Sequence, residues 1–238
     1  MTEVQLLEYV ISVAFLRAAL VTVALTVLSM TLGILGGLLL ALGASSRFRV
    51  LRALVAVYVW LFRGTPVLLQ LIFVFNVLPL VGLRFDSFTC AIIALSLNEA
   101  AYMAEVIRGG LMGVDRGQRT ASHMLGLSRV QTMLHVVLPQ MVRLVLPPTG
   151  NQLIGMLKTS ALASVVAVQD LLLVAQRTAA GNFDYVDALL AAAIHYLLLT
   201  TLCTLLVHAV EVKMDVSRKS QRRQRQETRA LVLEGGRR

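Results

Sequence analysis

The sequence predicts an all-α, polytopic membrane protein with five transmembrane helices and a helical loop on the cytoplasmic side. Of its 238 residues, 57% are hydrophobic and only 15% are charged, whereas soluble domains carry about 25% charged residues. The mean hydropathy is +0.77. Stretches long enough to cross a bilayer, which takes about 20 apolar residues per helix, recur along the chain. This composition excludes an ordinary soluble domain.

The first two spans are predicted before residue 84. The first covers about 18–44, inside a stretch without charged residues between Arg17 and Arg47. The second covers about 64–83. Its start is predicted at Thr65-Pro66, because a threonine hydroxyl caps helices and proline suits the first helical position.

Three further spans are predicted in the rest of the chain, at about 87–112, 147–174 and 188–210. The third span contains Glu99, Glu105 and Arg108 among its apolar residues. Pro147-Pro148 is taken as the start of the fourth span, in the same way as for the second. The last span has no charged residue and is predicted from its length alone.

The distribution of basic residues predicts the orientation. Of the 22 Lys and Arg residues, 18 fall in the first connection, the long third connection and the C-terminal segment. By the positive-inside rule these parts face the cytoplasm and the N-terminus faces outward. Val50–Phe62, basic at its start and apolar toward Trp60, suits a segment at the cytoplasmic interface. We assign 1–215 to a transmembrane domain and 216–238 to a basic cytoplasmic tail, solvated or in contact with anionic lipid.

The long connection at 113–139, here called the coupling loop, has structure of its own. Asp115 is placed to cap a short helix that ends at Gly126. Ser128 and Gln131 have the spacing of a capping box, which starts a second helix predicted to stop at Pro139. Such a helical projection suits docking of a cytoplasmic partner or recognition of DNA.

Several motifs occur in a fixed order. The coupling loop reads Gly-Gln-Arg-Thr-Ala-Ser-His-Met-Leu-Gly at 117–126 and Val-Val-Leu-Pro at 136–139. The others are Arg63-Gly64-Thr65-Pro66, Asn98-Glu99-Ala100-Ala101-Tyr102, Leu146-Pro147-Pro148, Lys158-Thr159-Ser160-Ala161-Leu162 and Asp170-Leu171-Leu172. Together they resemble the permease subunits of type I ABC importers, in particular the histidine and glutamine permease group for polar amino acids. The resemblance covers about residues 10–215.

The resemblance implies a subunit of a larger machine in a bacterial inner membrane. Family members pair two permease chains with a cytoplasmic ATPase dimer, and an extracytoplasmic solute-binding protein delivers the polar L-amino acid. ATP and Mg²⁺ would be bound by the ATPase, and no cofactor is expected on this chain. The nearest phosphate-loop pattern, Gly150 to Gly155, has Met156 where the lysine is needed.

The coupling loop departs from the family pattern. The family's glutamate falls on Thr120 and its second alanine on Ser122. The resemblance assigns ATPase coupling to Gly117, Thr120, Ala121, Ser122, Gly126, Leu127 and Pro139. One reading, which favours a heterodimer, is that Thr120 couples weakly and the second permease chain keeps the glutamate. The other is a tolerated substitution, compatible with a homodimer, because one exposed salt bridge is often worth under about 1 kcal/mol.

Ionisable residues inside a predicted span indicate a functional site unless they are paired. Asn98, Tyr102 and Glu105 are spaced to share one helical face, with Glu99 about 100° away. An amino acid carries a carboxylate and an ammonium group, so a pathway with both signs of charge and hydroxyls would suit it. We assign the translocation pathway to Asn98, Glu99, Tyr102, Lys158, Thr159 and Ser160.

A structural alternative remains for the charged residues. Glu99 or Glu105 could pair with Lys158 or with Arg108 simply to hold helices together. This alternative is favoured for Glu105, whose spacing to Arg108 is i, i+3.

No catalytic or metal site is predicted. The four histidines have spacings that place no pair on one helical face, and the sequence has no H-E-x-x-H or G-x-S-x-G motif. Two other functions stay open: a membrane-tethered DNA-binding regulator that uses 115–137 like a helix-turn-helix unit, and an ATP-independent channel. The DNA-binding alternative is weakened by how few base-reading side chains the second helix offers.

Overall fold

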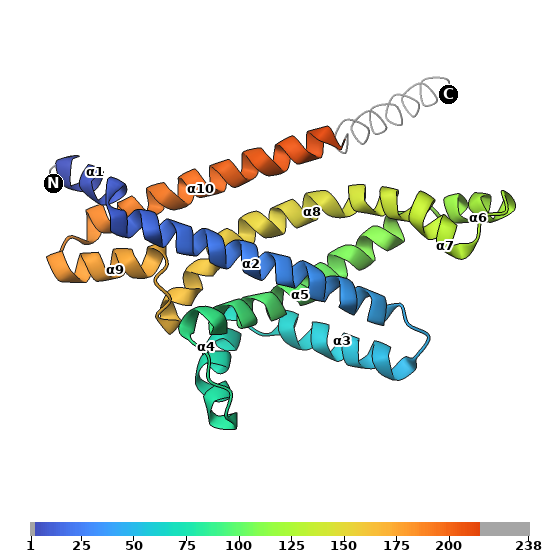
Figure 1. The fold of residues 1–238 in the computed structure, drawn as a ribbon, viewed down its shortest axis with the longest axis horizontal. Helices are drawn as coiled ribbons and strands as arrows, with labels where there is room; N and C mark the ends of the chain where they lie inside the picture. Colours follow the sequence, from blue (N-terminus) through green and yellow to red (C-terminus); the bar gives the residue numbers. More distant parts are fainter. Residues whose placement is uncertain (1–2, 215–238) are drawn as a thin grey trace, which may run out of the picture.

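The computed structural model describes residues 3–214, and these residues form helices with no strand. The predicted tail at 216–238 lies outside the described residues. The α-helices, labelled in Figure 1, are α1 Glu3–Ile11, α2 Val13–Ala44, α3 Arg49–Gly64, α4 Val67–Val77, α5 Ser87–Gly113, α6 Arg116–Met124, α7 Arg129–Thr132, α8 Leu138–Thr159, α9 Leu171–Asn182 and α10 Tyr185–Lys213. Leu78–Val81 and Ser160–Val166 are 3-10 helices, and Met133–Val137 is a π-helical turn.

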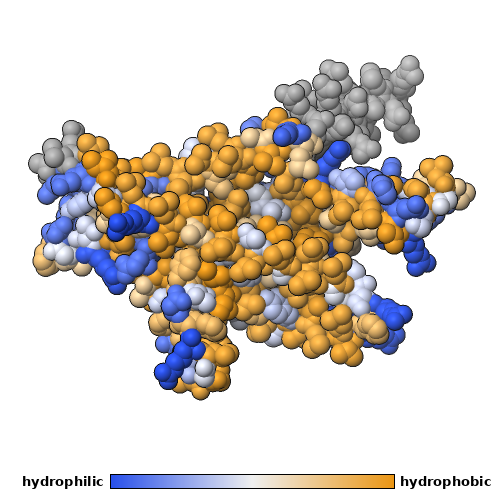
Figure 2. Space-filling view, in the orientation of Figure 1, coloured by the Kyte–Doolittle hydropathy of each residue, from blue (hydrophilic) through white to orange (hydrophobic). Residues whose placement is uncertain are grey.

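The all-α membrane fold is confirmed. Within residues 3–214, three helices are long and apolar enough to cross a bilayer by themselves, α2, α5 and α10, and the number rises to five if each of two bent helix pairs counts as one span. In Figure 2 hydrophobic residues cover most of the visible face, while hydrophilic residues gather at both ends of the long axis and at the tip of α4. The long α10 is mostly unburied, with exposed leucines along its length. This is the pattern expected of a surface that faces lipid.

Close packing of α2 against α5 forms the centre of the bundle (Figure 1). Gly33 and Gly37, one turn apart on α2, face α5. A Cβ atom added at Gly33 would lie 2.6 Å from Cβ of Glu99, and one at Gly37 would lie 2.5 Å from Cβ of Met103. Small residues spaced by four let two membrane helices approach this closely.

The predicted second span, at about 64–83, begins at a sharp bend and consists of α4 followed by the 3-10 helix Leu78–Val81. The chain turns by 104° between Arg49–Gly64 and Val67–Val81, and α4 projects away from the bundle in Figure 1. Pro66 is the N-cap residue of α4, so the predicted threonine cap is wrong. The Thr65 hydroxyl instead donates to the Leu61 carbonyl at 2.8 Å, which ties it to the preceding helix.

Helix α3 is also more than an interfacial segment. It lies alongside α2 and packs on both α2 and α5, and the Tyr58 hydroxyl donates to the Leu97 carbonyl at 2.8 Å. Helix α3 is followed by α4, an 11-residue helix, and then by the 3-10 helix Leu78–Val81. Proline removes a backbone donor and restricts the preceding residue to extended backbone, which explains the break.

The prediction that a helix starts at Pro147-Pro148 is wrong, because both prolines lie inside α8. The helical run is continuous from Arg129 to Val166, so Pro139 does not end a helix either but lies in the first turn of α8. Proline is compatible with helix interiors in membrane proteins, where neighbouring groups satisfy the freed carbonyls. The run ends at Ala167, a non-glycine residue with φ of 63°.

Buried polar contacts around Asp170 connect α2, α9 and α10. Asp170, fully buried, caps α9 by accepting from the Leu173 N–H at 2.9 Å. The Tyr196 hydroxyl of α10 donates to the same carboxylate at 3.4 Å, and the Thr22 hydroxyl of α2 accepts from the Leu171 N–H at 3.2 Å. These bonds join three helices and give a structural account of the aspartate in the predicted span.

Candidate functional site

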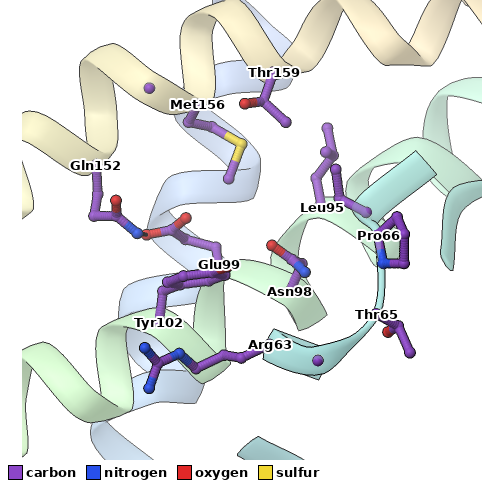
Figure 3. Close-up of a pocket in the computed structure, with 13 residues that line it drawn as sticks. Arg63, Thr65, Pro66, Leu95, Asn98, Glu99, Tyr102, Gln152, Met156 and Thr159 are labelled. Carbon is purple, nitrogen blue, oxygen red and sulfur yellow. Dashed lines mark hydrogen bonds between the residues drawn. The ribbon is translucent and has the colours of Figure 1, made fainter. Parts of the chain in front are cut away.

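A polar cavity of about 540 Å³ lies where the α3–α4 junction meets α5 and α8. Figure 3 shows side chains from these elements converging on it. It is lined by Arg63, Gly64, Thr65, Pro66, Val67, Leu95, Asn98, Glu99, Tyr102, Gln152, Gly155, Met156 and Thr159. Four of the predicted pathway residues, Asn98, Glu99, Tyr102 and Thr159, are thus brought together.

Asn98 is held by the broken backbone between α3 and α4. Its amide nitrogen donates to the Phe62 carbonyl at 2.9 Å and to Oε1 of Gln70 at 3.0 Å. The Gln70 amide nitrogen in turn donates to Phe62 O at 2.9 Å and to the Thr65 hydroxyl at 2.8 Å. The amides therefore satisfy carbonyls that the helix break leaves free, and they join α5 to the α3–α4 junction.

Glu99 is only 4% exposed although it carries an ionisable group. Gln152 of α8 donates to its Oε1 at 3.4 Å, as Figure 3 shows. Within residues 3–214 the carboxylate has no ion-pair partner. Its position depends on Gly33, because a larger residue on α2 would occupy the space of the glutamate's own Cβ and Cγ atoms.

Arg63 lies beside the cavity and bridges to a second charged cluster. Its guanidinium carbon is 5.2 Å from the centre of the Tyr102 ring, a cation–π distance. Its Nη1 is 3.8 Å from Oε2 of Glu105. Arg108 holds the same glutamate much more tightly, with Nη2 to Oε2 at 2.6 Å and Nε to Oε1 at 3.1 Å. The predicted i, i+3 pair is confirmed.

The other two predicted pathway residues lie elsewhere. The Ser160 hydroxyl is buried and donates to the Leu157 carbonyl at 2.8 Å. Lys158 is exposed, and in the described part of the chain it forms no ion pair, so its predicted pairing with Glu99 or Glu105 is wrong. Adjacent residues of a helix point about 100° apart, which places Thr159 in the cavity and Lys158 outside it.

The local structure of the coupling loop confirms its predicted helix starts. Oδ1 of Asp115 accepts from the Gly117 N–H at 2.6 Å, and Ser128 with Gln131 forms the full capping box. Gly126 has φ of 79°, the left-handed backbone that glycine adopts without strain. The first helix and its turn lie at one end of the molecule, beyond α8 (Figure 1).

The residues assigned to coupling differ in exposure. Gly117, Thr120, Ala121 and Gly126 are exposed, whereas Ser122 is buried and donates to the Gln118 carbonyl at 2.7 Å. Leu127 is half-buried. Met124 and Leu125, which the sequence analysis did not single out, are 86% and 82% exposed. The end of α6 therefore exposes two neighbouring large apolar side chains.

Sequence reasoning missed three residues of the cavity region: Arg63, Gln70 and Gln152. Charged residues stand out within apolar spans, whereas a neutral glutamine gives a weaker signal. A glutamine among apolar residues, such as Gln70 in α4, is a usable signal because its amide must find partners in the membrane. Of residues 3–214, no group of three or more His, Cys, Asp or Glu could hold a metal ion.

A multi-pass helical protein with a polar cavity among its apolar helices and a helical projection at one end has the architecture of a membrane transport subunit. A sequence profile for "Binding-protein-dependent transport system inner membrane component" matches residues 33–216, and the chain belongs to this family. It is therefore a multi-pass inner-membrane component of a transport system and not an enzyme.

Its relatives carry related names. The chain is 41% identical over 211 residues to "Arginine transport system permease protein ArgU" of Corynebacterium glutamicum, covering 82% of this chain and 66% of that longer relative. It is 37% identical to "L-cystine transport system permease protein TcyB" of Bacillus subtilis, covering 82% and 83%. It is 33% identical to "Glutamine transport system permease protein GlnP" of Escherichia coli, covering 84% and 93%.

Solved structures agree with the fold. The "Crystal structure of an amino acid ABC transporter with histidines" matches with a TM-score of 0.80 and 34% identity, over 84% of this chain and 94% of the solved one. A structure of the MetNI methionine ABC transporter in inward-facing conformations matches with a TM-score of 0.71 over 90% of this chain and 99% of the solved one. At 19% identity, this second likeness concerns the fold alone.

Proposed function

We propose that this chain is the permease subunit of an ATP-driven importer that moves a polar L-amino acid across the inner membrane. The observation that carries the proposal is the cavity of about 540 Å³, which brings a cation, a carboxylate and neutral hydrogen-bonding groups together among the helices. The names of the relatives support an amino-acid substrate. Neither the DNA-binding nor the channel alternative gains support from them.

The chemistry of the cavity suits a zwitterion. Arg63 supplies a positive charge for a carboxylate, and Glu99 supplies a negative charge for an ammonium group. Asn98, Gln152 and Thr159 add amide and hydroxyl groups for orientation. The volume lies within the range of about 300–1,000 Å³ that small-molecule sites occupy. Transport would release the substrate into this cavity and then to the cytoplasm, with the N-terminus outside and the C-terminus inside.

The partners follow from the same proposal. A cytoplasmic ATPase dimer, which holds ATP and Mg²⁺, would receive the coupling loop, and an extracytoplasmic solute-binding protein would deliver the amino acid. A second permease chain would complete the pathway. We favour a different second chain, because Thr120 stands in this loop where the family carries a glutamate. Exposed Met124 and Leu125 support a coupling contact that is apolar as well as charged.

The test of the site is uptake by the reconstituted transporter, measured with labelled arginine, glutamine, histidine and cystine. Glu99→Gln is expected to lower uptake or to change the order of preference among these substrates. Glu8→Gln, a charge removal of the same kind in α1, is the matched control and should leave both unchanged. Unchanged uptake and preference for Glu99→Gln would remove this residue from the pathway.

The partners require a separate measurement. Purification of the chain from its native membrane, followed by mass spectrometry, should recover an ATPase and a second, different permease chain. Two copies of this chain with no second permease would refute the heterodimer. Recovery without any ATPase would refute the importer itself.

A further inference from the structure

A second cavity, of about 430 Å³, lies on the other side of Arg63, between α3 and α5. The first turns of α3 lie at the end of the molecule that also carries the coupling loop (Figure 1). It shares Arg63 with the first cavity, and no other residue of the proposed transport pathway lines it. It is lined by Ala44, Arg52, Val55, Ala56, Val59, Trp60, Arg63, Glu105 and Arg108.

The charges around this cavity do not balance. It contains three arginines and one carboxylate, Glu105. That carboxylate is held by Arg108 through two hydrogen bonds, whereas Arg63 reaches it only at 3.8 Å. The Arg52 side chain is exposed, and its guanidinium has no hydrogen bond or ion pair with any residue in 3–214. The arrangement therefore leaves positive charge available for an anion.

The apolar part of the cavity is equally distinctive. Trp60 is 74% exposed although it is the largest apolar side chain of α3 and the only tryptophan of the protein. Leu54 and Val57, on neighbouring turns, are also largely exposed. Tryptophan is enriched where hydrocarbon meets the headgroups of a bilayer. One face of α3 thus offers hydrocarbon contacts next to a cationic cavity.

We propose that this cavity binds the phosphate of an anionic phospholipid, with Arg52 as the principal contact and the acyl chains lying along α3 past Trp60. Basic pockets between transmembrane helices on the cytoplasmic side bind such headgroups. Free phosphate would share the charge chemistry but would not use the exposed apolar face. The lipid site does not depend on which amino acid is transported.

The single tryptophan makes the proposal directly measurable. The full-length chain is reconstituted in phosphatidylcholine vesicles that contain a small fraction of brominated phosphatidylglycerol or, in parallel, brominated phosphatidylcholine. Bromine quenches tryptophan fluorescence at contact, so Trp60 reports which lipid occupies the cavity. We expect stronger quenching by the anionic lipid, and Arg52→Gln should weaken this preference about fivefold, the effect of one basic residue near a charged membrane surface.

Arg47→Gln is the matched control, because it removes the same charge from a residue that stacks on Phe48 outside the cavity. The Arg47→Gln variant should show the same preference for the anionic lipid as the native chain. Equal quenching by both lipids in the native chain would overturn the proposal. The proposal would also be overturned if Arg52→Gln and Arg47→Gln weakened the preference for the anionic lipid equally. If inorganic phosphate abolished the preference while chloride of the same ionic strength did not, the site would be one for free phosphate, and the lipid would be refuted.

Discussion

Replacing Gly33 by alanine tests whether the contact of α2 with α5 positions the cavity. The new Cβ would lie 2.6 Å from both Cβ and Cγ of Glu99, about 1 Å closer than ordinary van der Waals contact. The Cβ atom of Glu99 is fixed to the backbone and cannot rotate away from the new methyl group, so the two helices must separate. Overpacking of this kind costs about 1–3 kcal/mol.

A control variant is needed because replacing glycine by alanine also raises the helix propensity. Alanine is favoured over glycine by about 1 kcal/mol inside a helix, and that gain would mask part of the cost. Gly109→Ala in α5 makes the same change where no atom lies within 4 Å of the added Cβ. The difference between the two variants therefore isolates the steric cost.

The measurement is the free energy of unfolding of each purified variant in mixed micelles, by titration with a denaturing detergent. Gly33→Ala should be less stable than Gly109→Ala by about 1–3 kcal/mol. It should also alter uptake, since Glu99 moves with α5, whereas Gly109→Ala should not. Equal stability of the two variants would refute the close contact.

Three further predictions concern single groups. Asn98→Ala leaves the Gln70 side-chain oxygen without its donor and should lower the free energy of unfolding by about 1–3 kcal/mol; an unchanged denaturation midpoint would contradict this. Gly126→Ala forces an L-residue to φ near 79° in open space, so amide hydrogen exchange in the coupling loop should accelerate about fivefold or more, and unchanged protection would refute the strain. The hydrogen bond from the Thr89 hydroxyl, with backbone bonds, holds the pKa of Asp86 below its usual value. Its stabilising contribution is therefore present above about pH 4 and lost as the pH falls through the lower folded pKa, so the native chain and Asp86→Asn should differ in thermal midpoint at pH 7 and converge in strong acid.

Local signals predicted the helix starts of the coupling loop well. A capping box involves four consecutive residues, so Ser128 and Gln131 suffice to define it. Prolines predicted helix boundaries less well. Thr65-Pro66 marks a true break, while Pro147-Pro148 lies inside a helix. The two cases look alike in sequence, because the difference lies in which neighbouring groups satisfy the backbone.

In the candidate site, too, features within one helix could be predicted from the sequence, whereas contacts between helices could not. The face of α5 that carries Asn98 and Tyr102 follows from helical periodicity alone. The partners of that face come from other helices: Gln70 lies 28 residues away from Asn98, and Gln152 lies 53 residues away from Glu99. Such contacts depend on how helices pack, and Gly33 is part of what sets that packing.

The unbroken helix from the coupling loop to the cavity restricts how this protein can vary in length. Residues 129–159 run through α7, the π-helical turn and α8, about 46 Å at 1.5 Å per residue. One residue inserted between Ser128 and Gln152 would rotate the cavity side chains by about 100° relative to the loop. Insertions and deletions should therefore be accepted in the turns that join helices, but within this segment only as whole helical turns.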